Sequence, residues 1–132
     1  MHDNRAVTFS WQQLQEMADE EVRRTLAKLP ADVRDAARAL PVTFEPMPND
    51  DLVADGLDPD VLGLFVGGDH AEEEHCALPP QIILFLDNIW LMVADEEGGE
   101  ADYRREVRTT LLHELGHYLG LAEDELTERG LA

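Results

Sequence analysis

The most constraining feature of this sequence is a helical pattern of apolar residues near its C-terminal end, closed by a glycine. Apolar side chains recur there three and four residues apart, at Val107, Leu111, Leu112, Leu115 and Leu119. This spacing places side chains on one face of an α-helix. Gly120 follows at once and can adopt the left-handed conformation that ends a helix. The pattern therefore predicts a long helix over residues 101–119.

The same helix carries two of the five histidines of the chain, His113 and His117. At a separation of four residues they lie about 40° apart around the helix axis and about 6 Å apart along it. Imidazoles placed in this way can share one metal at the usual Zn–N distance of about 2.0–2.1 Å. Glu114 lies about 60° around the axis from His117, near enough to reach a water at the metal without binding the metal itself. The group predicts metal-assisted hydrolysis, and the alternative is an exposed helix face with two unrelated histidines.

A third protein ligand has to come from beyond Gly120. A straight helix would carry residue 123 about 15 Å past His113, so the chain must turn, and the glycine is where it can do so. Glu123 has the spacing that best suits a chain reversing onto the metal. Acid at the start of a helix needs no metal to explain it, so four candidates stay open: Glu123, Asp124, Glu125 and Glu128.

The sequence pattern of the N-terminal third predicts two helices. Ser10 and Gln13 form a capping-box pattern at the start of an amphipathic helix that Pro30 closes. A second, shorter helix is predicted over residues 31–40. Residues 47–60, which contain prolines and a glycine, are typical of a loop.

Three strands are predicted next, at VTFEP (42–46), VLGLFVGG (61–68) and QIILFLD (81–87). A short helix over residues 88–97 should pack Ile89, Trp90 and Val93 inward, and a last helical piece is predicted over residues 122–131. Helices, then strands, then helices indicate the α+β class in one domain, residues 1–132.

The net charge of the chain and the distribution of its apolar residues argue against binding to nucleic acids and against a membrane span. Twenty-nine acidic residues against ten basic ones give a formal net charge of −19, which disfavours binding to nucleic acids. The longest apolar run, IILFLDNIWLMVA, is interrupted by Asp87 and Asn88, so no membrane span is expected. The single cysteine, Cys76, suits a reducing compartment, and no secretion signal is visible, so we expect a soluble cytoplasmic protein. The oligomeric state stays open, and a monomer is compatible with the sequence.

Other residues could take part in chemistry. His70, His75 and Cys76 could form a second metal site, although such spacing in an acidic loop is usually incidental. Tyr103 and Tyr118 could stabilise a tetrahedral intermediate, although Tyr118 better suits packing. A serine triad has no support, because Ser10 is the only serine of the chain.

The segment LHELGHYLGLAEDEL is similar to the extended zincin pattern HExxHxxGxx(D/E). With the runs LGLFVGG and LPPQIILFLDNIW before it, residues 61–132 resemble the bacterial minimal zincin-like metallopeptidases. The resemblance implies a reduced single-domain zincin fold: a small mixed three-stranded sheet, N-terminal helices, an active-site helix and a short C-terminal helix. It implies Zn²⁺ bound by His113, His117 and Glu123, with Glu114 as the general base. The sequence departs from metzincins in having no methionine after the motif.

Two functions follow from these observations. The first is a zinc-dependent metallopeptidase that hydrolyses peptide bonds in a substrate the sequence does not specify. The second is a non-catalytic, metal-stabilised binding or regulatory module that docks on a partner protein. Glu114 favours the peptidase, since a structural metal needs no base, whereas the small size of the chain favours the module.

Overall fold

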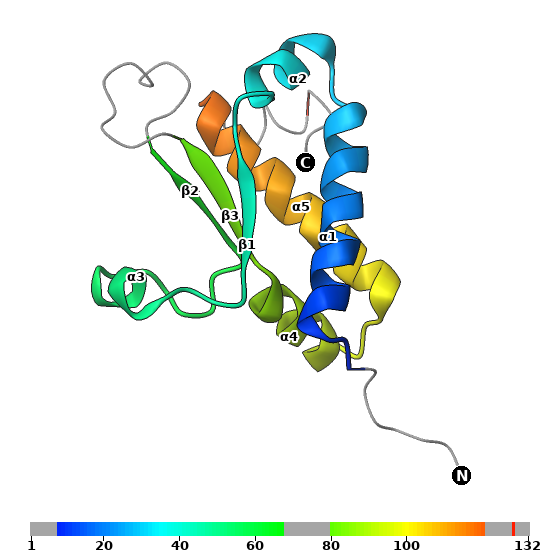
Figure 1. The fold of residues 1–132 in the computed structure, drawn as a ribbon, viewed down its shortest axis with the longest axis vertical. Helices are drawn as coiled ribbons and strands as arrows, with labels where there is room; N and C mark the ends of the chain where they lie inside the picture. Colours follow the sequence, from blue (N-terminus) through cyan, green and yellow to red (C-terminus); the bar gives the residue numbers. More distant parts are fainter. Residues whose placement is uncertain (1–7, 68–79, 121–127, 129–132) are drawn as a thin grey trace.

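The computed structural model of the protein describes residues 8–67, 80–120 and 128 (Figure 1). The fold belongs to the predicted α+β class, and apart from α3 its helices and strands follow the predicted order. Their bounds are α1 Trp11–Ala27, α2 Ala31–Ala37, β1 Val42–Glu45, α3 Asp50–Ala54, β2 Gly63–Val66, β3 Gln81–Phe85, α4 Leu86–Asp95 and α5 Glu100–Leu119.

The strands form one small mixed sheet with the order β1-β3-β2. The central strand, β3, runs parallel to β1 and antiparallel to β2. Ile82 and Leu84 of β3 are fully buried, as expected for the strand with neighbours on both sides. Among the described residues β2 pairs on one side only, so its outer edge carries backbone groups without a strand partner.

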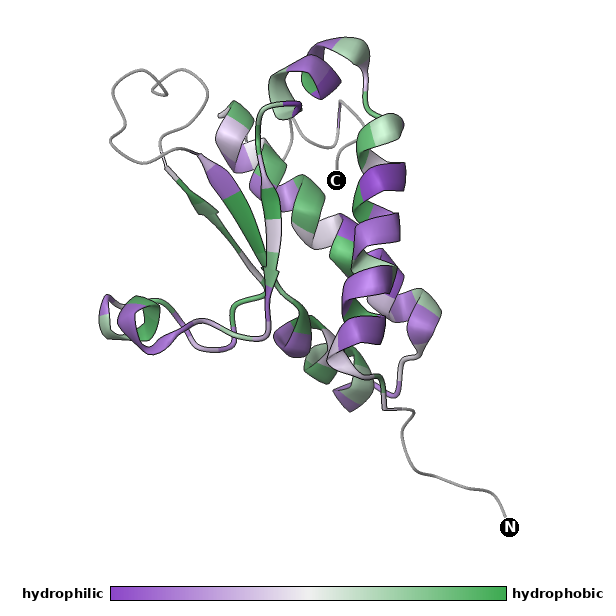
Figure 2. Cartoon of the chain, in the orientation of Figure 1, coloured by the Kyte–Doolittle hydropathy of each residue, from purple (hydrophilic) through white to green (hydrophobic). Residues whose placement is uncertain are grey.

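The long helix α5 organises the core, because it contacts β2 and β3 of the sheet as well as α1 and α4. Val107, Leu111 and Leu115 are buried, which confirms the predicted apolar face (Figure 2). Gly120 has a φ of 71° and ends the helix in the left-handed conformation, as predicted. None of the helices in the described ranges combines the length and apolarity needed to cross a membrane.

The first helix begins with the predicted capping box. The Gln13 backbone N–H donates to Ser10 Oγ at 3.1 Å, and the Ser10 N–H donates to Gln13 Oε1 at 2.8 Å. Leu14, Ala18 and Val22 are buried, and α1 contacts α5 and α4 through this face. The outer face of α1 is polar (Figure 2), so a single apolar face attaches the helix to the core.

The prediction of a loop over residues 47–60 is wrong in one part, because α3 occupies Asp50–Ala54. Asn49 accepts a hydrogen bond from the Leu52 N–H at 2.8 Å, and Asp50 and Asp51 lie in the first turn, where the helix dipole favours acid. One turn is too short to show helical periodicity in the sequence. No residue of α3 is buried, and the segment projects from the body of the protein (Figure 1).

The helices after the sheet agree with the prediction except at their ends. Ile89, Trp90 and Val93 of α4 are buried, as predicted. The helix begins at Leu86, two residues early, because β3 passes into α4 without a connecting loop. Of the predicted last helix, only Glu128 belongs to the described residues, and it is helical and exposed.

The fully buried Tyr103 connects α5 to α1. Its hydroxyl group donates a hydrogen bond to the Leu14 carbonyl oxygen at 2.9 Å. Burial raises the pKa of Tyr103 above its ordinary value, the charge of Asp87 raises it further, and Arg104 opposes the shift. The hydrogen bond and the raised pKa together make this contact dependent on pH.

Replacing Tyr103 with Phe should lower the free energy of unfolding by about 1 kcal/mol at pH 7, the typical net value of one hydrogen bond. Because the pKa is higher in the folded state, Tyr103 contributes stability that is complete below its unfolded pKa of about 10 and is lost as pH rises above it. The difference in the free energy of unfolding between the wild type and Tyr103→Phe should therefore decrease as pH rises past about 10. Urea unfolding of both proteins at pH 7 and at alkaline pH measures this difference. Groups that titrate in both proteins contribute equally to the two free energies of unfolding, so their contributions cancel. A difference in the free energy of unfolding that does not change with pH would contradict this explanation.

Candidate metal centre

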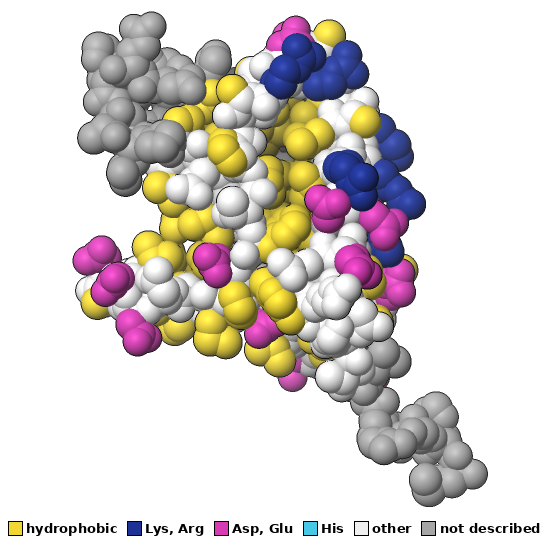
Figure 3. Space-filling model, viewed as in Figure 1, with side chains coloured by type: hydrophobic (Ala, Val, Ile, Leu, Met, Phe, Trp, Pro, Cys, Tyr) yellow, Lys and Arg dark blue, Asp and Glu magenta, His cyan; other side chains and the backbone are white. Residues whose placement is uncertain are grey.

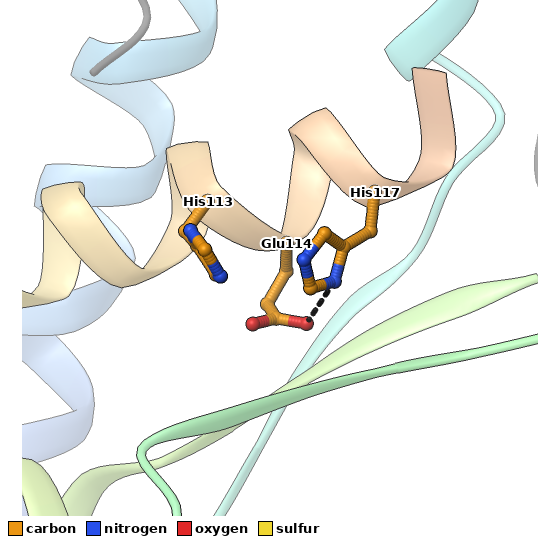
Figure 4. A group of neighbouring side chains, drawn as sticks. All are labelled: His113, Glu114 and His117. Carbon is orange, nitrogen blue, oxygen red and sulfur yellow. Dashed lines mark ion pairs between the residues drawn. The ribbon is translucent and has the colours of Figure 1, made fainter. Parts of the chain in front are cut away.

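The structure brings His113, Glu114 and His117 together on α5 (Figure 4). One ligand atom from each of the three side chains lies within 4.8 Å of the other two. The imidazole ring centroids of the two histidines are 4.6 Å apart and their planes are inclined at 65°. The four-residue spacing thus places both imidazoles over the same stretch of helix surface.

The three side chains differ in their exposure to solvent. The Glu114 side chain is only 9% exposed, whereas that of His117 is 50% exposed, and His113 is exposed as well. The Glu114 side chain points from α5 toward the strands, with one carboxylate oxygen 3.4 Å from His117 Nδ1 (Figure 4). The carboxylate is therefore held against the protein, while the imidazoles face the solvent from which an ion or a substrate would come.

One face of α5 packs along β2, and Glu114 belongs to that face. Thr110, Glu114 and Tyr118 are four residues apart and are all buried. The Tyr118 ring packs edge-on against the ring of Phe65 at 5.6 Å. Two residues before Phe65, at Gly63, a Cβ atom would lie 2.7 Å from Thr110 Cγ2 and 3.3 Å from Glu114 Cγ. The strand thus lies close to α5 at Gly63, opposite the side chains of Thr110 and Glu114.

Sequence reasoning did not identify Gly63 as a neighbour of the site. The available signal was a glycine inside the apolar strand pattern VLGLFVGG, since glycine within a strand often marks a close approach of another part of the chain. That signal gives no information about which part approaches, because the contact joins residues far apart in the sequence.

The donor atoms of the site fit a zinc ion. Zinc binds imidazole nitrogen and carboxylate oxygen, and two nitrogens on one tetrahedral zinc would be about 3.4 Å apart for Zn–N bonds of about 2.0–2.1 Å. The ligand atoms lie within 4.8 Å of one another and both histidines are exposed to solvent, so small changes in side-chain rotamer would bring two nitrogens to that separation. The site therefore offers two nitrogen ligands and one adjacent carboxylate.

The two tyrosines have structural roles in the core. Tyr118 is buried against Phe65, in line with the expectation that it packs. The prediction that Tyr103 could stabilise a tetrahedral intermediate is wrong. Tyr103 precedes His113 by ten residues, which is about 15 Å along a helix, and its hydroxyl group is held by the Leu14 carbonyl oxygen.

Several predicted ligands lie outside the described residues. Glu123, predicted as the third metal ligand, is one of them, and so are its alternatives Asp124 and Glu125. The possible second metal site lies outside as well, with its three members His70, His75 and Cys76. These assignments stay predictions.

Comparison with known protein families gives a match. The family model of the zincin-like metallopeptidases matches residues 37–131, which begins at the end of α2 and includes the whole sheet and α5. A search of the curated proteins finds no match.

Proposed function

This chain belongs to the zincin-like metallopeptidase family, and on that premise we propose that it is a zinc-dependent peptidase with Glu114 as its general base. The observation that carries the proposal is the contrast between a buried carboxylate and two exposed imidazoles on one turn of α5. A metal with a purely structural role has no need of a base beside it, whereas hydrolysis requires one.

Each residue of the site has a distinct task in this proposal. When bound, zinc would supply a Lewis acid that polarises the scissile carbonyl group and lowers the pKa of water. His113 and His117, as neutral imidazoles, would hold the ion. Glu114 would accept a proton from the attacking water and give it to the leaving amine. Its carboxylate needs a fixed position for these transfers, because a base acts only within about 2.6–3.2 Å of the proton donor.

The edge of the sheet gives a physical reason to expect a peptide as substrate. Among the described residues, β2 pairs only with β3, and a Cβ atom at Gly63 of β2 would lie 3.3 Å from Glu114 Cγ. An extended peptide can add to such an edge through backbone hydrogen bonds, which do not depend on its sequence. A peptide bound in that way would lie beside the two imidazoles.

The distribution of charge narrows the choice of test substrates. The sequence has no lysine or arginine between residues 40 and 103, the part that contains all three described strands. Arginine and lysine side chains gather over α1 and α2, whereas acidic side chains gather over α3 (Figure 3). Since a negative potential attracts cations, peptides rich in lysine and arginine should be tested first. A cytoplasmic location is part of the proposal, because Cys76 is the only cysteine.

Incubation with a peptide library tests the proposed activity. The zinc-loaded protein should produce new peptide termini that mass spectrometry detects, and protein stripped of zinc should not. Termini that form at the same rate without zinc would contradict a metal-dependent peptidase.

The alternative function is a metal-stabilised binding or regulatory module that docks on a partner protein. It would require a structural zinc, which four protein ligands close, whereas a catalytic zinc keeps one position open. X-ray absorption spectra of the zinc-loaded protein count the ligands. Two nitrogens with oxygen at the remaining positions would favour the peptidase, and a sulfur or a third histidine would favour the module.

We predict that Glu123, three residues past Gly120, is the third protein ligand. Loss of a residue that only hydrogen-bonds a metal ligand weakens metal binding by about 10–100-fold. Glu123→Ala should weaken zinc binding by more than that. Asp124→Ala is the matched control, since it removes a neighbouring carboxylate of the same charge and should leave zinc affinity near that of the wild type. Competition with a chromophoric chelator measures both affinities. A larger loss in Asp124→Ala than in Glu123→Ala would overturn the assignment.

A further inference from the structure

The close approach of β2 to α5 leaves no room for a side chain at Gly63. A Cβ atom there would lie 2.7 Å from Thr110 Cγ2, 3.3 Å from Glu114 Cγ and 3.4 Å from the Ile83 carbonyl oxygen. Gly63 has no positive φ, so its backbone conformation would suit any residue. The requirement for glycine at this position is therefore one of space.

The start of β2 is fixed against the rest of the protein. Asn88 of α4 donates hydrogen bonds to the carbonyl oxygens of Pro59 and Val61, at 2.8 and 2.9 Å. The Phe85 N–H donates to the Leu62 carbonyl oxygen at 2.9 Å. With the residues before Gly63 held in this way, the strand cannot easily retreat from α5. An added side chain would instead displace the helix side chains that face it.

Of those side chains, Glu114 has the more freedom to move. Thr110 is β-branched and restricted to two χ1 rotamers in a helix, whereas Glu114 has a longer, unbranched side chain with more rotamers. The Glu114 Cγ lies 3.3 Å from the position that a Cβ atom at Gly63 would take, and the Glu114 carboxylate lies 3.4 Å from His117 Nδ1. The backbone at Gly63 thus borders the space that the Glu114 side chain occupies, and it limits the rotamers that Glu114 can adopt.

We propose that Gly63 is a positioning residue that fixes the Glu114 carboxylate beside the two imidazoles. The inference rests on the proposed function only in what the carboxylate does there, since the steric contact exists whether or not the protein is a peptidase. Gly63 itself would touch neither the metal nor the reacting atoms.

Gly63→Ala is the direct test. We expect kcat to fall several-fold, because a Cβ atom at 3.3 Å would move Glu114 Cγ by a few tenths of an ångström, and a displacement of about 1 Å at a reacting group can cost about 10²-fold in rate. Zinc affinity and KM should stay within about twofold, because no imidazole is among the nearest neighbours of the added Cβ and the substrate binding that sets KM does not involve the base. If Gly63 only supported the fold, its substitution would not lower kcat while KM stayed constant.

Gly98→Ala is the matched control. A Cβ atom at Gly98 would also meet a side chain at 2.7 Å, in this case Val93 Cγ1. Gly98 lies in the turn between α4 and α5, beside Asp102 and away from the histidine pair. The shortest contact is the same at both positions, and at Gly98 two Asp102 atoms would also lie at 3.0 Å, so thermal stability should fall at least as much in Gly98→Ala as in Gly63→Ala. We expect kcat per folded, zinc-loaded molecule to fall in Gly63→Ala alone.

A spectroscopic measurement keeps this inference separate from the proposed activity. In the zinc-loaded chain, the carboxyl carbon resonance of Glu114 can be assigned as the one missing from Glu114→Gln. It should move in Gly63→Ala and stay in place in Gly98→Ala. A moved resonance in a protein that cleaves no peptide would support the positioning role while the peptidase fails. A resonance and a kcat that both equal those of the wild type would overturn the positioning role.

A second variant covers the case in which Gly63→Ala does not fold. The double substitution Gly63→Ala with Thr110→Ser removes the methyl group that the new Cβ would meet at 2.7 Å and keeps the contact with Glu114. Compared with Thr110→Ser alone, it should show the moved Glu114 resonance at recovered stability. A Glu114 resonance that stays in place would again overturn the inference.

Discussion

Replacing Glu114 with Gln should lower the rate of peptide hydrolysis by about 10²–10⁴-fold, the usual contribution of general acid–base catalysis. The amide has nearly the shape of the carboxylate but accepts no proton at neutral pH. Because the side chain is 9% exposed and packed against β2, the substitution keeps the contacts of the Cγ atom. Folding and zinc content should therefore stay close to those of the wild type.

Steady-state kinetics on a peptide that the wild type cleaves measures this effect, with zinc content determined on the same samples. Asp102→Asn is a suitable control, because it neutralises an acid on the first turn of α5, far from the histidines. Equal rates for Glu114→Gln and the wild type would show that another group is the base.

The second large effect is the loss of zinc from His113→Ala and His117→Ala. Each substitution removes one of the two nitrogen ligands that α5 provides, and the remaining imidazole and acids bind zinc far more weakly than a complete site. Both histidines are exposed, so neither alanine leaves a cavity in the core, and the metal-free fold should persist. We expect each variant to retain less than about a tenth of the stoichiometric zinc, since a complete set of ligands is what gives such sites their affinity.

Elemental analysis after dialysis, with circular dichroism to confirm the fold, measures the zinc content. His75→Ala is the matched control, as it removes a histidine outside the motif, and it should keep one zinc per chain. Full zinc content in His113→Ala or His117→Ala would place the metal elsewhere. Loss of zinc in His75→Ala would support the alternative of a site that His75 helps to close.

Local patterns predicted the parts of the fold that are determined locally. The apolar spacing that ends at Gly120 predicted α5, and the Ser10–Gln13 pair predicted the start of α1 with its hydrogen bonds. The histidines four residues apart came together for the same reason, since helix geometry alone sets their separation. The family resemblance seen in the sequence is confirmed by the match over residues 37–131.

Contacts between distant segments could not be predicted from the sequence. The approach of Gly63 to Glu114 depends on how β2 packs on α5, and the role of Tyr103 depends on where α1 passes it. Helix α3 was missed for a different reason. A single turn that buries no side chain has no apolar period, so only its cap at Asn49 distinguishes it from a loop.

Hydrolysis measured as a function of bound zinc tests the central claim most directly. Metal-free protein is titrated with zinc while the cleavage of one identified peptide is followed. The account predicts a rate that rises linearly to one zinc per chain and then stays constant, with no such rise for Glu114→Gln. A rate independent of zinc, or a protein that binds one zinc at His113 and His117 and cleaves no peptide in the library, would contradict it.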